Sequence, residues 1–480
     1  MQSRLAIAAG VAIALAAGTA HAQSKPQPPK AQAKGQTHTL QDALAAAYAN
    51  NPTLQGARAL LRATDENVPA ALAGWRPQVS IAASVGGTDG SLTEPIQGLT
   101  GTTTTSVPFT RNLNSVAITA TQPLYRGGKT RASINKAENQ VLSQRAQLMA
   151  SEEQVFSDTI NAYVAVIQDQ QLLALDQANE ALLTKELQAT NDRFRVGELT
   201  RTDVAQAESA LAAAAATRET AEGTLQTARA TYEQLVGEPP GDLVDPQPLQ
   251  SPLRTLDDAK AESGRNNPNV VAALFADSAA QDAFDVAYSA LMPTLSLQGT
   301  AFRYGNQNGV AETNTGAQAL INLSVPIYQG GSEYAAIRQA RQQELQARNA
   351  LEEQRRAAVQ LATASWTQVA AARAAIISGR AAVRAGQVAV EGLEREALVG
   401  SATTLDVLTA VQNLLNAQTA LVQSLASLIT ASYQVAAAVG RLSARDLHLQ
   451  VPLYDEKAYY TAVHDLWVGT GDFATDQPGR

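Results

Sequence analysis

Phe194-Arg195-Val196-Gly197-Glu198-Leu199-Thr200-Arg201-Thr202-Asp203-Val204 is the stretch that decides the fold, because the chain carries a second version of it. The second version reads Ala397-Leu398-Val399-Gly400-Ser401-Ala402-Thr403-Thr404-Leu405-Asp406-Val407. In both, a Val-Gly pair is followed at the same spacing by Asp-Val. A long helical pattern precedes each copy and a shorter one follows it. We interpret both copies as sharp turns at the tip of a helical hairpin.

The segment before the first turn is unusually long. No glycine or proline interrupts the chain from Thr130 to Val196, and apolar residues recur at Ile134, Val141, Leu148 and Val155. This heptad spacing is typical of coiled-coil packing. At about 1.5 Å per residue, a helix of this length spans about 100 Å.

Short motifs on either side of the long segments also repeat. Thr39-Leu40-Gln41-Asp42 with Asn51-Pro52 returns as Thr255-Leu256-Asp257-Asp258 with Asn267-Pro268. Pro123, Tyr125, Gly127 and Gly128 return as Pro326, Tyr328, Gly330 and Gly331. Each half therefore reads as short helix, β-hairpin, long helix and short helix. The short helices of one half, stacked end to end, match the long helix in length.

Alternating apolar residues predict the strands, at about 77–86, 114–122, 293–304 and 318–325. We expect the Gly/Thr/Ser-rich stretch from Gly86 to Asn112 to be a loop. Each exit proline should end its hairpin, because proline cannot donate to a ladder, and each Gly-Gly pair should let the chain turn into the long helix.

The chain divides accordingly. We predict a signal peptide at 1–22, a flexible linker at 23–37, a first repeat at 38–237 with its long helix at about 130–196, a connector at 238–254, a second repeat at 255–442 with its long helix at about 332–399, and a C-terminal tail at 443–480. The helix that begins at Thr39 is expected to run to about Ala73. The tail shows no clear period.

Composition narrows the function. The formal charge of −8 argues against a nucleic-acid partner, and the absence of cysteine removes disulfides and thiol chemistry. The four histidines are scattered without metal-ligand spacing, and no phosphate loop or nucleophile elbow is present. We therefore expect neither an enzyme nor a cofactor.

The uncharged stretch from Val407 to Gly440 contains many amides and hydroxyls, so we interpret it as a buried or pore-facing helix rather than a lipid-exposed one.

Four strands cannot close a barrel, and an open sheet edge is not tolerated in lipid. The pattern therefore demands more than one chain. Three chains would give twelve strands, although the residues alone do not fix the number three.

With its duplication, its Asn-Pro pairs, its Pro-x-Tyr-x-Gly-Gly exits and its two Val-Gly…Asp-Val turns, the chain resembles the TolC family of outer-membrane efflux and type I secretion channels. The resemblance spans about Thr39 to Leu442. It implies a mainly α fold with a small β part: a homotrimer with a twelve-stranded β-barrel in the outer membrane, continued by an α-helical coiled-coil tunnel in the periplasm. It also implies two partners, a periplasmic adaptor and an inner-membrane pump of the RND or ABC class.

The resemblance assigns roles to particular residues. The periplasmic gate would involve Asp406, with Thr409 and Asp203; family members often carry a second acidic residue where Thr409 stands, and some have Arg where Ala402 stands. The adaptor would contact Val196, Gly197, Leu199, Val399 and Gly400. The barrel-to-helix transition would lie at the two Pro-x-Tyr-x-Gly-Gly exits, with Tyr125 and Tyr328 in an interfacial aromatic belt.

Each role has a simpler alternative. Thr403 and Asp406, like Thr200 and Asp203, have the spacing of a capping box, so both carboxylates could serve only as helix caps. The tip glycines could serve only to stop a helix with positive φ. The two tyrosines could simply pack where strand meets helix. For the whole chain, the alternative is a periplasmic adaptor-like or coiled-coil scaffold protein.

Overall fold

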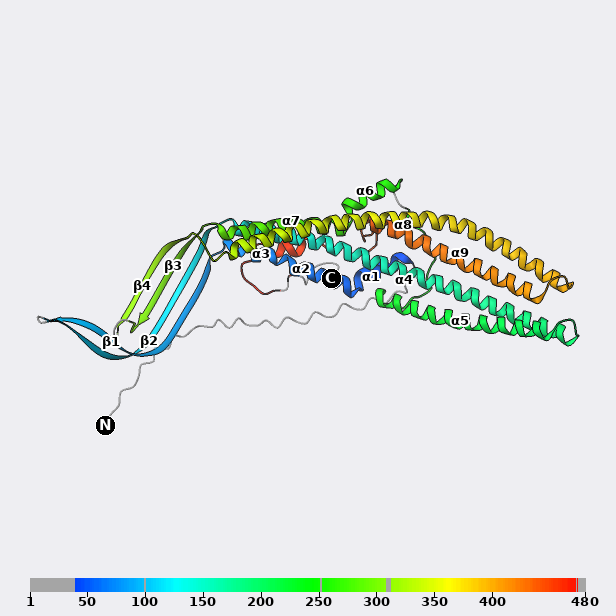
Figure 1. Ribbon diagram of the computed structural model, residues 1–480, viewed down its shortest axis with the longest axis horizontal. Helices are drawn as coiled ribbons and strands as arrows, with labels where there is room; N and C mark the ends of the chain where they lie inside the picture. The colour runs from blue at the N-terminus through cyan, green and yellow to red at the C-terminus, as the bar shows by residue number, and fades with distance from the viewer. Residues whose placement is uncertain (1–38, 99–100, 251–252, 308–311, 472, 474–480) are drawn as a thin grey trace, which may run out of the picture. The chain divides into compact units, whose positions relative to one another are not determined.

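Two helices of 67 residues, α4 (Lys129–Arg195) and α8 (Ser332–Leu398), run through the helical part. The computed structural model describes residues 39–98, 101–250, 253–307, 312–471 and 473. Each long helix turns back into a shorter one, α5 (Arg201–Val236) or α9 (Thr404–Ala438), which packs along it. Both turns lie at the end of the helical part opposite the strands (Figure 1). The predicted plan of two repeats, each with a long helical hairpin, is confirmed.

Shorter helices precede each hairpin. In the first half they are α1 (Leu40–Asn50), α2 (Pro52–Asp65), α3 (Asn67–Leu72) and the 3₁₀ turn η1 (Ala73–Trp75). In the second they are α6 (Leu256–Asn266), α7 (Pro268–Tyr288) and η2 (Ser289–Leu291). The expected single helix from Thr39 to about Ala73 is wrong. Proline disfavours the α conformation in the residue before it, and Asn51 is extended, with φ −66° and ψ 122°.

The Asn-Pro pairs join the two short helices of each half. The Asn51 side chain accepts from the Thr53 amide at 2.9 Å, which caps α2, and its Nδ2 donates to the Leu235 carbonyl of α5 at 3.0 Å. Asn267 caps α7 in the same way, and its Nδ2 donates to the Ala438 carbonyl of α9 at 3.1 Å. One side chain thus satisfies free groups at the start of one helix and the end of another. The short helices therefore meet end to end, as their lengths predicted.

Four antiparallel strands form one sheet in the order β1-β2-β3-β4. They are β1 (Gln78–Gly98), β2 (Gly101–Arg126), β3 (Thr294–Gly305) and β4 (Thr313–Ser324). The register aligns apolar residues across the sheet: Ile81 faces Ile118, and Leu297 faces Ile321. Residues between them, such as Ser80 opposite Thr119, belong to the other face. The sheet thus has one apolar and one polar face.

The first hairpin is much longer than the sequence suggested. The expected loop from Gly86 to Asn112 is wrong, because β1 and β2 stay paired to Gly98 and Gly101. Threonine-rich segments have high β-propensity, and cross-strand contacts support the ladder. Phe109 faces Gly90, where an added Cβ would lie 3.2 Å from its ring. In the second hairpin, β4 begins at Thr313, earlier than the expected position near 318.

Up to residue 471 the C-terminal tail follows a defined path, although its sequence shows no period. Beyond Arg441 it packs on the first helices and α4: the Tyr454 amide donates to the Tyr48 hydroxyl at 3.0 Å, and Val463 of α10 (Ala458–Val463) is fully buried. The main apolar core lies beneath this region and contains large aromatic side chains such as Phe156, Tyr163 and Tyr232. These core side chains come from several elements, which a periodicity search within one element does not detect.

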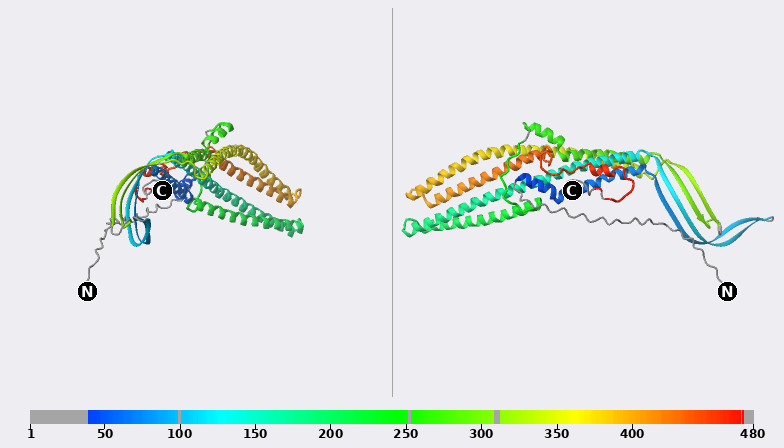
Figure 2. Two further views of the ribbon diagram at one scale, coloured as in Figure 1. Left: turned by 60° about the vertical axis from the view of Figure 1, so that its left-hand side comes forward. Right: turned by 180° about the vertical axis from the view of Figure 1, so that it is seen from behind.

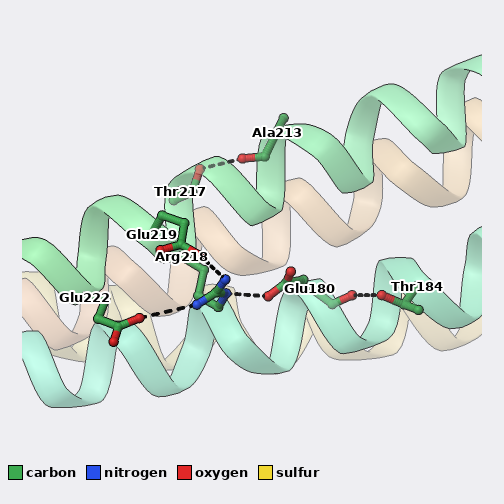
Figure 3. A network of polar contacts seen from close by, with 7 residues as sticks. All are labelled: Glu180, Thr184, Ala213, Thr217, Arg218, Glu219 and Glu222. Carbon is green, nitrogen blue, oxygen red and sulfur yellow. Dashed lines mark hydrogen bonds and ion pairs between the residues drawn. The ribbon is translucent and has the colours of Figure 1, made fainter.

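A polar network ties the first hairpin together (Figure 3). Arg218 of α5 pairs with Glu180 of α4 at 2.7 Å, and it also contacts Glu219 and Glu222 on its own helix. At the same place in the second hairpin, Gly379 of α8 lies against Leu421 of α9. The first hairpin is therefore held partly by ions and the second by apolar packing.

Candidate functional site

Both hairpin tips have the same backbone geometry. Gly197 and Gly400 adopt φ of 82° and 79°, a region that glycine enters without strain. At the first tip the Glu198 amide donates to the Arg193 carbonyl at 3.0 Å, and at the second the Ser401 amide donates to the Glu396 carbonyl at 2.9 Å. These bonds form a Schellman motif, which satisfies the last carbonyls of each long helix.

The two aspartates close the turns as helix caps. The Asp406 carboxylate accepts from the Thr403 amide at 2.9 Å and from its hydroxyl at 2.6 Å. Asp203 makes the corresponding bonds with Thr200 at 2.8 and 2.7 Å. Hydrogen bonds from threonine lower the pKa of both carboxyl groups, so each stays ionised at neutral pH. The capping alternative is thus present in the structure at both tips.

Charge distinguishes the tips. Residues 391–406 contain four carboxylates and one cation, a net charge of −3. The equivalent residues 188–203 contain three of each and are neutral. At the first tip Arg193 pairs with Glu198 at 3.1 Å and also contributes to lowering the pKa of Asp203. Asp406 is fully exposed, and only its threonine bonds lower its pKa. The second tip therefore keeps a net negative charge, since its one cation, Arg395, pairs with Glu391 at 3.6 Å and leaves the other carboxylates without a cation.

Apolar side chains at the tips lie open to solvent. Val196 is 72% exposed, Leu398 78% and Val399 79%, whereas Leu199 is half-buried. Phe194 and Leu405 are exposed as well. Sequence reasoning did not select Phe194, Leu398 or Leu405, although each lies within the quoted turn segments. Clustered exposed apolar groups of this kind mark a contact surface.

Thr409 adds no charge to the second tip. Its hydroxyl donates to the Leu405 carbonyl within α9 at 2.7 Å. Ala402, at the turn before α9, is half-buried. The helix itself, α9, is long and apolar enough to cross a membrane by length and composition, yet it packs along α8 and α4 in the helical part. Only 17% of its most apolar window is buried in the single chain.

The strand exits differ more than their sequences do. The expectation that Pro123 ends its hairpin is wrong, because β2 continues to Arg126. Pro123 has no backbone N–H to donate, and the pairing of β2 with β3 shifts register between Pro123 and Tyr125. In the second half, Pro326 and Tyr328 lie beyond the end of β4. Tyr125 and Tyr328 are both exposed.

The glycine pairs begin the long helices as expected. Gly128 and Gly331 occupy the N-cap positions of α4 and α8 with φ of 85° and 86°. Gly127 and Gly330 also have positive φ. Only Gly127 is tightly enclosed, since an added Cβ would lie 2.5 Å from the Cβ of Met292.

No cluster of three metal-ligating side chains occurs within the described ranges. The features that stand out are instead the two tips, the strand exits and the long helices between them.

Known proteins share this arrangement. The model of the family described as "Outer membrane efflux protein" matches residues 43–238 and 261–441. The outer membrane efflux protein BepC of Brucella suis is 35% identical over 435 residues, which cover 90% of this chain and 92% of BepC. The outer membrane protein TolC of Escherichia coli is 24% identical, covering 70% of this chain and 71% of TolC.

Solved structures agree on the fold. The outer-membrane channel OprN superposes with a TM-score of 0.72 at 20% identity, covering 84% of this chain and 89% of OprN. VceC of Vibrio cholerae superposes with a TM-score of 0.71, covering 84% of this chain and 96% of VceC. Together with the match to BepC over nearly the full length of both proteins, these similarities show that the chain belongs to the TolC family of outer membrane efflux proteins.

Proposed function

We propose that this protein forms the outer-membrane exit duct of an efflux or type I secretion system. The observation that carries the proposal is the sheet. Within the described residues its edge strands β1 and β4 are each paired on one side only, with β2 and β3, and one of its faces is apolar and exposed. In lipid such a sheet must be closed by copies of itself. Three copies would supply twelve strands, enough for a barrel with a channel.

The helical part would continue the barrel into the periplasm as a tunnel. The two hairpins per chain would then bring six tips together at its far end. Family membership favours this reading over an adaptor or scaffold protein. Because the chain shows no enzymatic constellation within the described residues, energy for transport would come from an inner-membrane pump, of the RND or ABC class.

The experiment that tests the proposal is conductance in planar bilayers. The purified protein should open ion-conducting channels after insertion. An oligomer that inserts into lipid and never conducts would contradict the proposal. Recovery of the protein in the soluble periplasmic fraction would also contradict it.

Gating is expected to depend on Asp406. Around a three-fold axis the net charge of −3 at the second tip would be repeated three times, and like charges at a narrow mouth attract cations. Asp406→Asn keeps a side-chain acceptor for the cap and removes the charge. We expect this variant to show lower cation selectivity in single-channel recordings. Asp203→Asn is the matched control, because it makes the same change in an equal cap at the neutral tip, and its selectivity should match the unmodified channel.

Equal selectivity changes in the two variants would assign Asp406 to capping alone. A variant of Thr403 that removes the cap and leaves the carboxylate would separate the two roles further: it should lower thermal stability while cation selectivity persists.

The exposed apolar tips are proposed to receive the periplasmic adaptor. Replacing Leu398 and Val399 with serine removes two of the most exposed apolar groups of the tip without touching the turn glycine. We expect the double variant to recover at least tenfold less adaptor in crosslinked pull-downs, while its bilayer conductance is unchanged. Val388→Ser, an exposed apolar position of α8 before the tip, is the control. Undiminished adaptor recovery by the tip variant would contradict this docking site.

A further inference from the structure

Two apolar side chains near the end of the ordered tail lie in solvent. Trp467 is 65% exposed and Val468 is 85% exposed. They follow directly on a segment that is firmly held, since Val463 is fully buried and the Leu466 amide donates to the Val463 carbonyl at 3.0 Å. A tryptophan exposed in this way leaves most of its apolar ring in contact with water instead of packed against other apolar groups.

A series of contacts fixes the path of the tail to this point. The Ala444 amide donates to Glu152 of α4, and the Tyr459 hydroxyl donates to Glu66 at 2.8 Å. Tyr460 of α10 packs against Val68 and Val141. In the right-hand view of Figure 2 the red C-terminal segment lies beside the first helices, near the ends of the strands. The tail therefore acts as a strap along the helical part, and Trp467 lies at its sheet end.

Arg76 sets the level of Trp467 relative to the sheet. Its Nη1 donates to the Leu466 carbonyl at 2.6 Å, and its guanidinium carbon lies 4.9 Å from the centre of the Trp467 ring. Arg76 is two residues before the first residue of β1, Gln78. The neighbouring Trp75 carbonyl accepts from Gln122 of β2 at 2.8 Å. Trp467 thus lies at the level where the strands begin.

The surroundings at this level combine exposed apolar rings with cations. Trp75, Leu124 and Tyr125 are exposed. Three cations occur at the same level, and within the described ranges none of them pairs with a carboxylate: Arg76, Arg126 and Lys129. The tail's own acid here, Asp465, contacts His464 at 2.9 Å.

We propose that the end of the strap is a membrane foot: Trp467 and Val468 insert into the inner leaflet of the outer membrane, with Arg76 and its neighbouring cations on phospholipid phosphates. The inference rests on the proposed function. A duct must keep its interior open, so the face that the tail covers is the outer one. The apolar face of the sheet, with Val79 and Ile81 exposed, begins just beyond this point.

The physical match is to a lipid interface. Tryptophan concentrates where hydrocarbon meets headgroups, because its ring is apolar and its N–H is polar. Cations beside it favour the anionic phosphates of phospholipids. The foot has no counterpart in the internal repeat, since the tail follows the second half only.

The chain's tryptophan content allows a direct test. It has three tryptophans, Trp75, Trp366 and Trp467. Trp75→Phe with Trp366→Phe leaves Trp467 as the only reporter, and Trp75→Phe with Trp467→Phe leaves Trp366. Trp366 lies on α8 about 50 Å from the start of that helix, so it is a control far from the sheet. Both full-length variants are reconstituted in liposomes of bromine-labelled phosphatidylcholine and of unlabelled phosphatidylcholine.

We expect bromine to quench Trp467 emission at least twofold and to leave Trp366 unchanged. Equal quenching of the two would overturn the proposal, as would unquenched and blue-shifted Trp467 emission, which would mean that a second copy of the chain covers the ring. Bilayer conductance of the same samples separates the outcomes: conducting channels without quenching refute the foot and leave the duct intact.

A second reporter leaves all three tryptophans in place. The chain has no cysteine, so Val468→Cys can be spin-labelled at a single site, with Ala216→Cys on an exposed part of α5 as the control. The label at 468 should be more accessible to oxygen than to a water-soluble nickel complex, and the label at 216 should show the reverse order. Aqueous accessibility at both sites would overturn the proposal.

Discussion

Gly440→Ala is expected to destabilise the helical part far more than Gly237→Ala, although the two glycines occupy equivalent places at the ends of α9 and α5. Both have positive φ, 75° and 87°, and alanine in that region costs about 1–2 kcal/mol. At Gly237 an added Cβ would meet only the Asn50 side chain, at an ordinary 3.7 Å. At Gly440 it would lie within van der Waals overlap of the Asn266 backbone, 2.4 Å from its carbonyl oxygen.

A backbone carbonyl cannot move aside as a side chain can. Asn266 is the last residue of α6 and precedes Asn267, whose side chain joins α7 to α9. Relief of the clash would therefore displace that junction, and overpacking of this kind costs about 1–3 kcal/mol beyond the backbone strain. We expect the thermal midpoint of the helical circular dichroism signal in detergent to fall at least twice as far for Gly440→Ala.

Asparagine separates strain from clash. It tolerates positive φ better than alanine but still carries a Cβ. Gly237→Asn should be close to neutral, whereas Gly440→Asn should remain costly. Equal midpoints for the two alanine variants would contradict the clash. If Gly440→Ala does not accumulate, the pair of asparagine variants still decides the question.

This pair shows what the sequence could and could not predict. The two glycines could be predicted to end their helices from the sequence alone, because the end of a helix depends on local backbone geometry. The repeat could be recognised in the same way. The clash at Gly440 could not be predicted, because it depends on which backbone the end of α9 contacts after folding. The prediction of a loop at Gly86–Asn112 was wrong for a related reason. Its glycines favour a loop in isolation, yet threonine has high β-propensity and strand pairing, including Phe109 over Gly90, keeps the stretch extended.

At the tips, the residue types were predictable and their surroundings were not. The Thr-x-x-Asp spacing identified both caps, and the structure has both. The net charge of −3 around Asp406 can be counted in the sequence. It depends on residues of the preceding helix, such as Glu394 and Glu396, which lie outside the repeated turn motif. The exposure of Leu398 follows from the position of the turn at the end of the hairpin, which only the arrangement of helices reveals.

Stability is expected to fall as pH rises from about 5 to 9, and Glu153→Gln should remove much of that fall. Glu153 of α4 is buried, and its Oε1 accepts from the Leu442 amide at 3.3 Å, where the tail leaves α9. Burial, with smaller contributions from the neighbouring carboxylates of Glu152 and Asp446, raises the pKa of this carboxyl group from 4.5 to about 8, against the lowering effect of the hydrogen bond from the Leu442 amide. Burial also raises the pKa of Glu152, against the lowering effects of the hydrogen bond from the Ala444 amide and of the Arg58 and Arg445 charges.

The sign follows from proton binding. Between pH 4.5 and about 8 the folded protein keeps the proton on Glu153 while the unfolded chain has lost it. Stability from this group is therefore fully present below pH 4.5 and is lost as pH rises through about 8. A shift of this size corresponds to a loss on the order of 5 kcal/mol. Asp65 adds a smaller loss of the same sign, since burial raises its pKa to about 7, against the lowering effect of Arg145.

Glutamine is neutral at every pH and keeps an acceptor for the Leu442 amide. We expect guanidinium unfolding in detergent, followed by circular dichroism, to give a free energy that depends less on pH for Glu153→Gln, with the variant more stable than the unmodified protein at pH 9. Adding Asp65→Asn should flatten the dependence further. Glu233→Gln, an exposed carboxylate of α5, is the control and should leave the slope unchanged. An unaltered slope in Glu153→Gln would contradict the prediction, because it would mean that this carboxylate is reached by water and stays charged in the folded protein.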